Sequence, residues 1–302
     1  MISHEGNAYN PDTLCREFAH RHNLLDTQLV KRDLLAIYWT TRTKLEIDAN
    51  LGAHTEEFDH LDPLWALLRS MLNRIFGHVE GAIVAYVTGS TASSEVISRT
   101  AIESAINLLY ILVDERKGNR LAQYLAHYFN NEQREIDQWL KAASKLAGEA
   151  QKVHQLAATE KRTRIHKLQG TTDFSLSQVG LPTTEASATN WPKISERFRL
   201  LGLEIDYRTV YAGLCSQTHN DAEDLLNYFF AVASGNQELI DKAALETVNF
   251  SRFMLYFAVK YYIAAAGGYA MRFELTKALG TCLASNATVK KPEKSIRLTV
   301  DK

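Results

Sequence analysis

The chain is poor in cysteine, proline and glycine, and it carries almost no net charge. Its 302 residues include only 3 cysteines, 5 prolines and 15 glycines. Widely spaced cysteines without a CxxC pair exclude a disulfide-rich secreted scaffold and favour a reducing compartment. So few prolines leave room for long helices, because proline breaks a helix interior. A formal charge of −1 argues against a protein dedicated to binding duplex nucleic acid.

The sequence also lacks an uninterrupted apolar run of membrane-spanning length and a leader-like pattern at its N-terminus. The most apolar stretch, from Phe250 to Phe273, is interrupted by Arg252, Lys260 and Arg272. A spanning helix needs about 20 apolar residues with few charges, so this stretch is predicted to be a buried core helix. We therefore expect a cytoplasmic protein with no membrane partner.

Helical periodicity is what the sequence does contain. Between Leu64 and Ile75, apolar residues recur at intervals of three and four, which places them on one face of a helix. Residues 30–47 form a second predicted helix, and Ser93 or Ser94 is expected to cap the next one. No run of alternating β-branched residues indicates a strand.

The second half of the chain is predicted to contain longer helices. Residues 117–158 are rich in good helix formers and indicate a long helical hairpin. A polar loop is expected near 165–190, where Thr, Ser, Gly and Pro are frequent and no period is visible. The last long helix is expected over 237–284, with a break or kink at Gly267-Gly268.

These patterns predict an all-α fold: a multi-helix bundle with a long helical hairpin and a polar loop. We expect residues 1–92 to form an N-terminal helical segment that packs on the core. Residues 93–284 are predicted to form the bundle, and residues 285–302 a polar tail.

Catalytic signatures such as a Walker loop, a GxSxG elbow or an HExxH pair are absent, and neither a metal nor a cofactor is expected. One constellation is Arg99 and Glu103, whose i,i+4 spacing places both side chains on one helix face. Small and apolar neighbours favour an inward orientation of that face. The alternative is an ordinary surface ion pair.

A second constellation lies in the segment from Asp206 to Asp224. Tyr211, Cys215 and His219 are spaced by four residues and share a helix stripe, with Ser216 beside them. Because buried polar groups require partners, Arg99 and Glu103 are candidate partners across the bundle. The alternative is a tyrosine and a histidine satisfied in the core.

These two motifs, SRTAIESAINLLYIL and YRTVYAGLCSQTHND, resemble the bacterial domain-of-unknown-function family 5677. The family pattern is an Arg and a Glu one helical turn apart, followed by Tyr, Ser and His. The matching positions are listed here in chain order: Arg99, Glu103, Tyr211, Ser216 and His219. The resemblance spans about residues 95–230 and brings no established activity with it.

The arrangement is also similar, more distantly, to the helical HEPN domains, many of which are metal-independent ribonucleases of toxin–antitoxin and phage-defence systems. Their signature is Arg, four to six residues, then His. Arg16 with His22 and Arg120 with His127 have that spacing, whereas His219 has no Arg at the required distance. The chain departs from the signature at its own candidate site.

The resemblance leads to a first hypothesis, an RNA-cleaving effector of a defence or toxin–antitoxin locus. His219 would act as general acid and base, because imidazole titrates near neutrality. Arg99 would stabilise phosphate charge, and Glu103 would orient Arg99. Tyr211 and Ser216 would contact the substrate.

Arg162 and Arg164, in the basic run at 161–167, would bind the RNA backbone. That run completes the set of predicted substrate-binding residues.

Two other hypotheses remain open. The same residues would serve a non-catalytic module that senses a nucleotide or another small ligand. Alternatively, the chain is an interaction protein that binds a second copy or a partner protein encoded nearby. Its interface would then be an aromatic stripe on the C-terminal helix, for which ordinary core packing is the competing interpretation: Phe250, Phe253, Phe257, Tyr261 and Tyr262.

Overall fold

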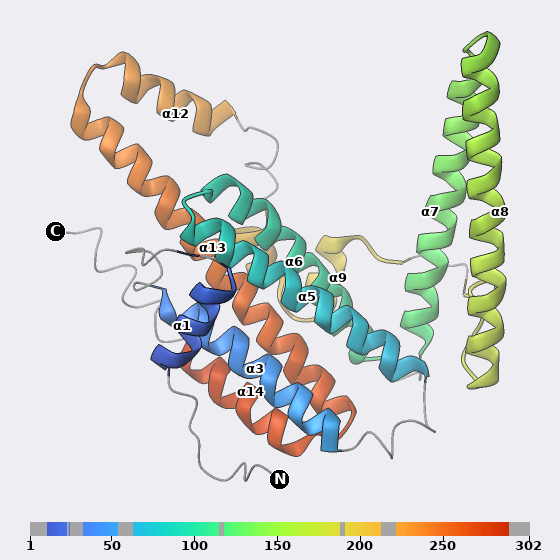
Figure 1. Cartoon of the computed structure of the whole chain (residues 1–302), viewed down its shortest axis with the longest axis horizontal. Coiled ribbons are helices and arrows are strands. Elements are labelled where there is room, and N and C mark those ends of the chain that lie inside the picture. Colours follow the sequence, from blue (N-terminus) through green and yellow to red (C-terminus); the bar gives the residue numbers. More distant parts are fainter. Residues whose placement is uncertain are drawn as a thin grey trace. The chain divides into compact units, whose positions relative to one another are not determined.

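The structure of the chain is a computed structural model. It describes residues 11–22, 24, 33–53, 63–114, 118–187, 191–212 and 222–289. Every regular element within these residues is a helix, which confirms the predicted all-α fold. The chain divides into two compact units (Figure 1). Unit 1 comprises Met1–Leu112 and Ile194–Lys302, and unit 2 comprises Val113–Lys193, so unit 2 is an insertion in unit 1. The domain boundaries expected at residues 92 and 284 are not tested by this division and stay predictions.

Unit 1 is a bundle in which α5, α6 and α13 form the centre. Helix α6 packs mainly against α5 and α13, and α13 also contacts α14 and α3. The described helices of unit 1 are, in chain order, α1 (Pro11–Arg21), α3 (Leu34–Ala53), α5 (Pro63–Val87), α6 (Thr91–Leu112), α9 (Ile194–Leu200), α10 (Glu204–Asp206), η1 (Tyr207–Tyr211), α12 (Ala222–Ala233), α13 (Gln237–Arg272) and α14 (Thr276–Val289). The predicted helices near 30–47 and 64–75 correspond to α3 and α5.

Helix α6 begins earlier than the sequence predicts. Its first residue is Thr91, so neither Ser93 nor Ser94 is the capping residue. Ser94 is instead buried, and its hydroxyl donates a hydrogen bond to the carbonyl of Ala82 on α5 at 2.9 Å. A serine within a helix can bond a neighbouring backbone as well as cap, and the sequence alone does not distinguish the two uses.

Helix α13 confirms the predicted buried core helix and corrects its predicted break. The helix continues through Gly267 and Gly268 and ends at Arg272. The chain turns instead at Glu274, whose φ of 57° is left-handed. At Gly268, a Cβ atom would lie 3.3 Å from Leu112 Cδ1. The glycine therefore permits close helix packing and produces no kink.

The aromatic stripe on α13 belongs to the core of its own chain. Phe257, Tyr261 and Tyr262 are buried, and Tyr262 packs against Phe76 of α5 with 5.9 Å between ring centroids. For these three residues the burial supports ordinary core packing, and the oligomer interface stays a prediction. Large aromatic side chains on a long helix contribute most when other helices cover them.

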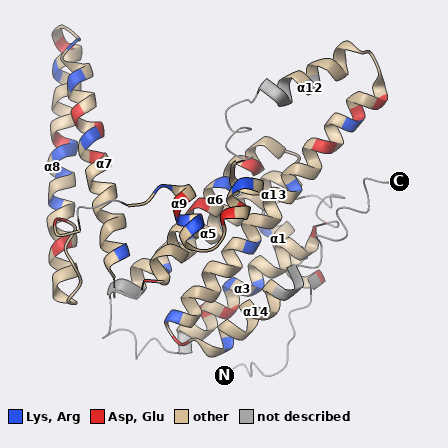
Figure 2. Ribbon diagram, turned by 180° about the vertical axis from the view of Figure 1, so that it is seen from behind, with Lys and Arg blue, Asp and Glu red and all other residues tan. Residues whose placement is uncertain are grey.

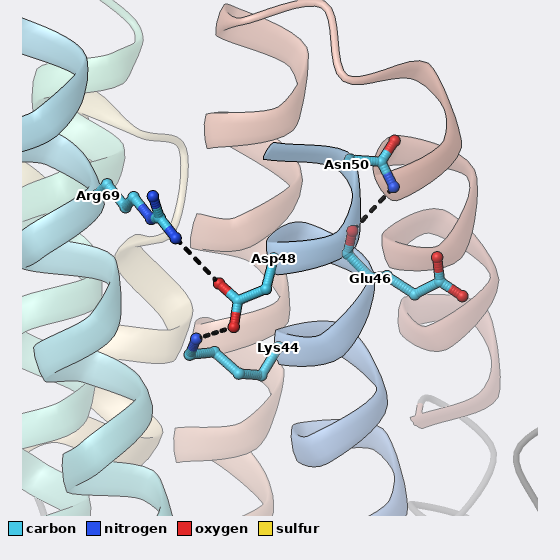
Figure 3. A network of polar contacts seen from close by, with 5 residues as sticks. All are labelled: Lys44, Glu46, Asp48, Asn50 and Arg69. Carbon is cyan, nitrogen blue, oxygen red and sulfur yellow. Dashed lines mark hydrogen bonds and ion pairs between the residues drawn. The ribbon is translucent and has the colours of Figure 1, made fainter. Parts of the chain in front are cut away.

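A polar network at the surface links α3 to α5 (Figure 3). Asp48 of α3 forms ion pairs with Lys44 on its own helix and with Arg69 of α5, the latter at 3.5 Å. The side chains are about one-fifth to one-third exposed, so the network is solvated. Pairs of this kind contribute little to stability, and the network orients the two helices without forming a candidate site.

Unit 2 is the predicted long helical hairpin. Helix α7 (Asn119–Ala143) and helix α8 (Gly148–Gln178) pack against each other around Phe129, Ile136 and Ile165. The polar loop predicted near 165–190 begins only at Val179, since α8 continues to Gln178. Threonine and serine hydroxyls of the last turns bond to carbonyls three or four residues earlier, which lets a polar sequence remain helical.

None of the described helices combines the length of a membrane span with sufficient apolar character. The stretch from Phe250 to Phe273, the most apolar in the sequence, instead supplies the largest share of buried residues in α13.

Candidate functional site

Helix α6 places Arg99 and Glu103 on one face, as their spacing predicts. Both side chains are half-buried, and their neighbours Ser98, Ala101 and Ile102 on the same helix are fully buried. Helix α6 also packs against α9. The two charged residues therefore lie at the edge of the core, where a charge needs a specific partner.

That partner is Tyr211, at the end of η1. The Tyr211 hydroxyl donates a hydrogen bond to Glu103 Oε2 at 2.7 Å across 108 residues of sequence. The Arg99 guanidinium carbon lies 5.6 Å from the centroid of the Tyr211 ring, a cation–π distance. Tyr211 itself is only 2% exposed. We refer to Arg99, Glu103 and Tyr211 as the arginine–tyrosine centre.

A wide helical turn presents Tyr211 to α6. The segment Tyr207–Tyr211 is π-helical and follows directly on the short helix α10. Single π-helical turns are rare and occur frequently at functional sites. The turn stacks the rings of Tyr207 and Tyr211, with 5.8 Å between centroids and 24° between planes.

Phe198 of α9 packs against these rings. Its side chain is completely buried, and its ring lies 5.7 Å from Tyr207, 5.6 Å from Tyr211 and 5.9 Å from Tyr261. Aromatic pairs at such distances contribute beyond simple burial. The position of the Tyr211 hydroxyl thus depends on a packed aromatic cluster.

Sequence reasoning missed a second carboxylate next to the same cluster. Asp206 Oδ2 accepts a 2.6 Å hydrogen bond from the Tyr261 hydroxyl and pairs with Lys260 at 3.3 Å. The sequence feature that could have indicated this carboxylate is Lys260, a lysine within the most apolar stretch of the chain. A charge in a buried helix requires a partner, and Asp206 supplies it.

Basic and acidic residues occur together around the site. Figure 2 shows both colours together on and around α6 and α9. Each of the two carboxylates, Glu103 and Asp206, accepts a hydrogen bond from a tyrosine, which spreads its negative charge.

One turn beyond Glu103, the Asn107 amide oxygen is buried and finds no hydrogen-bond partner among the described residues. Such an oxygen is a candidate contact for a ligand.

Burial controls the ionisation of the tyrosines at the site. Burial first, and then the hydrogen bond to Glu103, raises the pKa of Tyr211 above its ordinary value of 10.0, although Arg99 acts in the opposite direction. Burial and the bond to Asp206 raise the pKa of Tyr261 in the same way. Both phenols therefore remain protonated donors throughout the physiological range.

These raised values predict a loss of stability in alkali. A buried tyrosine keeps its proton above pH 10.0, where the unfolded chain releases it, so its contribution is complete below pH 10.0 and disappears as the pH rises through the folded-state pKa. Tyr256, whose pKa burial raises to about 12, acts likewise. We expect urea unfolding at about pH 11 to give a lower free energy than at about pH 8. This decrease in the free energy of unfolding should be smaller for Tyr261→Phe than for wild type. An equal decrease in both proteins would contradict the role of Tyr261 in the loss of stability.

Of the other predicted site residues, two lie outside the described part of the chain and two belong to unit 2. Ser216 and His219 lie outside the described residues. Arg162 and Arg164 are on α8 of unit 2. Arg162 pairs with Asp137 of α7, which neutralises part of the charge that the sequence analysis assigned to RNA binding, whereas Arg164 is exposed.

Within the described residues, no cluster of three or more His, Cys, Asp or Glu side chains could hold a metal ion. The arginine–tyrosine centre itself presents a guanidinium, a phenol and a carboxylate.

Comparison with known proteins gives one match. A model described as a family of unknown function (DUF5677) matches residues 66–237, more than half of the chain. The matched segment contains the whole arginine–tyrosine centre, both helices of unit 2 and the segment of His219. No curated protein and no solved structure matches the chain.

Proposed function

The chain belongs to this family of unknown function, and we propose that it is an RNA-binding effector whose arginine–tyrosine centre holds a phosphate group. The observation that carries the proposal is the position of Arg99. Its guanidinium is half-buried beside the Tyr211 ring, and the Tyr211 hydroxyl is held by Glu103. A guanidinium oriented in this way is suited to bind phosphate oxygens, because its donors match their geometry.

Tyr211 and Glu103 would orient the arginine for this task. Preorganised donors bind developing charge without reorganisation, which is the main way proteins stabilise phosphate chemistry. Tyr207 is half-exposed, and its ring, which stacks on that of Tyr211 and lies 5.8 Å from the Arg208 guanidinium carbon, offers a surface on which a base can stack. Phosphate and base are the two features that a nucleotide or an RNA strand presents together.

His219 would make the centre catalytic. It follows Tyr211 by eight residues, and an imidazole at the ligand could move protons at a ribose 2′-hydroxyl and a leaving oxygen without a metal. On this proposal the chain is a metal-independent ribonuclease of a defence or toxin–antitoxin locus, similar to HEPN proteins.

One observation favours a second candidate, a non-catalytic nucleotide sensor. Tyr211 is almost fully buried and its hydroxyl is already bonded, so it acts as a support and has little surface left for substrate. The HEPN signature of Arg followed by His is also absent around His219. A sensor would bind the same phosphate through Arg99 and leave it intact.

His219→Ala separates the two candidates. The purified chain is incubated with labelled single-stranded RNA in the presence of a chelator, and both cleavage and binding are measured. For a ribonuclease, we expect His219→Ala to lower cleavage by about 100-fold or more while RNA still binds, because the proton-transfer group alone is lost. Binding without cleavage in both proteins would support the sensor. No binding of RNA or of any nucleotide would contradict both.

A further inference from the structure

Helix α8 carries apolar side chains on two opposite faces. Ala158 and Ile165 are buried on the side that faces α7. Val153, Leu156 and Phe174 point the other way, since they fall about half a turn from the buried positions, and each is more than half exposed. Helix α7 covers only the first face, so the second is unpartnered within the hairpin.

The charges of α8 are divided between the same two sides. Lys161 and Arg162, next to the buried side, pair with Glu132 and Asp137 of α7. Glu160 and Lys167 lie on the outward face with Val153, Leu156 and Phe174, and in the described part of the chain neither has an ion-pair partner. Figure 2 shows basic and acidic residues distributed along the hairpin. The outward face thus combines exposed apolar ends with unmatched charges of both signs.

The order of these residues is self-complementary. Val153 and Phe174 lie equally far from the midpoint between Thr163 and Arg164, and so do Glu160 and Lys167. If a second α8 runs antiparallel to the first about that midpoint, each Val153 is level with a Phe174. Each Glu160 is then level with a Lys167, because the helical rise is constant along both helices.

With twofold symmetry, the Val153–Phe174 pair and the Glu160–Lys167 pair each occur twice in the interface. A twofold interface uses the same patch on both subunits, so one favourable pair implies an identical second pair. Arg164 of each copy then lies about one turn along the helix from Glu160 of the other. A different partner would have to reproduce this order of apolar and charged residues by coincidence.

We propose that the outward face of α8 is the interface between two copies of this chain, which associate antiparallel about a twofold axis near Thr163. The occupant of the face is a second copy, and the charge complementarity of Glu160 with Lys167 is the feature that specifies it. The proposal is independent of the function of the arginine–tyrosine centre.

Charge reversal tests the pairing in the full chain by sedimentation velocity over a range of concentrations. Wild type is expected to form a dimer. Glu160→Lys and Lys167→Glu are each expected to raise the dimer dissociation constant by about tenfold or more, because symmetry places two like-charge pairs in the interface. An equimolar mixture of the two variants should form a heterodimer that is tighter than either variant homodimer, since both 160–167 pairs are then again opposite in sign.

Glu135→Lys is the matched control, because it makes the same charge change at an exposed position of α7 and should leave the dimer unaltered. A wild type that stays monomeric would overturn the proposal. So would single variants that dimerise as wild type does, or a mixture that does not recover.

A cross-link gives a second, independent readout. Thr163→Cys places two thiols beside the proposed axis, and mild oxidation should produce a disulfide-linked dimer on a non-reducing gel. Wild type, which carries the natural Cys15, Cys215 and Cys282, provides the background. Cross-linking of Thr163→Cys no greater than that background would contradict the antiparallel arrangement.

Discussion

Replacing Arg99 by alanine is expected to weaken the binding of single-stranded RNA or of a nucleotide by about 10- to 100-fold. A hydrogen bond between a guanidinium and a charged acceptor contributes about 1.5–3 kcal/mol, and each 1.4 kcal/mol changes an affinity tenfold. Arg99 lies over the ring of a buried tyrosine, so its replacement removes the cation that this ring holds in place. Fluorescence anisotropy with a labelled oligonucleotide measures the change directly.

Arg199→Ala is the matched control for this experiment. Arg199 lies on α9, next to Phe198, but it is exposed and pairs with Glu196 at 3.5 Å. Its replacement should change affinity by less than about threefold, because a solvated, paired arginine contributes little. Arg99→Lys should retain part of the affinity, since the charge remains while the planar fork is lost. Equal losses for Arg99→Ala and Arg199→Ala would indicate non-specific electrostatic binding and would contradict a centre at Arg99.

Replacing Phe198 by alanine is expected to destabilise the protein by about 3–5 kcal/mol, the usual cost of removing a buried phenylalanine. Phe198 has no exposed surface, and its ring contacts three tyrosines from η1 and α13. The cavity would remove support from Tyr207 and Tyr211 together. Urea unfolding followed by circular dichroism gives the free energy.

The same variant should also weaken ligand binding under conditions where the protein is still folded, because Tyr211 would no longer be held against Arg99 and Glu103. Phe229→Ala provides the comparison, since the Phe229 side chain on α12 is mostly exposed and its loss should cost at most about 0.5 kcal/mol. A cost for Phe198→Ala similar to that of Phe229→Ala would show that the aromatic cluster does not support the site.

The pairing at the arginine–tyrosine centre could be anticipated because each part of it follows from a local rule. Helical spacing places Arg99 and Glu103 on one face, and the requirement that buried polar groups have partners directs attention to Tyr211. The structure brings these three residues together. The functional roles assigned to them stay predictions, as does that of His219.

Contacts between distant segments explain the features of the site and fold that could not be predicted from the sequence. Asp206 and Lys260 are 54 residues apart, and no periodicity connects a short turn to a helix of the core. The sequence predicts a break or kink at Gly268, but the residue lies within α13, where a Cβ atom would come within 3.3 Å of Leu112 and 3.4 Å of Leu109. In both cases packing between distant segments overrides the local preference of the residue.

The end of α8 is a third example, in which side-chain bonds rather than packing decide. The polar residues near 171–178 are weak helix formers, yet Asp173 accepts hydrogen bonds from the backbone N–H and the hydroxyl of Thr184. The returning loop is thus attached to the last turns of the helix. Because that contact requires residues on both sides of the turn, a window of local sequence does not reveal it.

The insertion of unit 2 determines the order in which the protein is completed as it leaves the ribosome. Helix α6 packs largely against α13, which begins at Gln237, after all of unit 2 has been synthesised. The hairpin of α7 and α8 needs only its own neighbouring residues, and local contacts form quickly. The nascent chain therefore has a complete hairpin while the apolar face of α6 still lacks its cover. During that interval α5 is the partner already available to α6, and the face that α13 later covers stays exposed, a condition that favours aggregation.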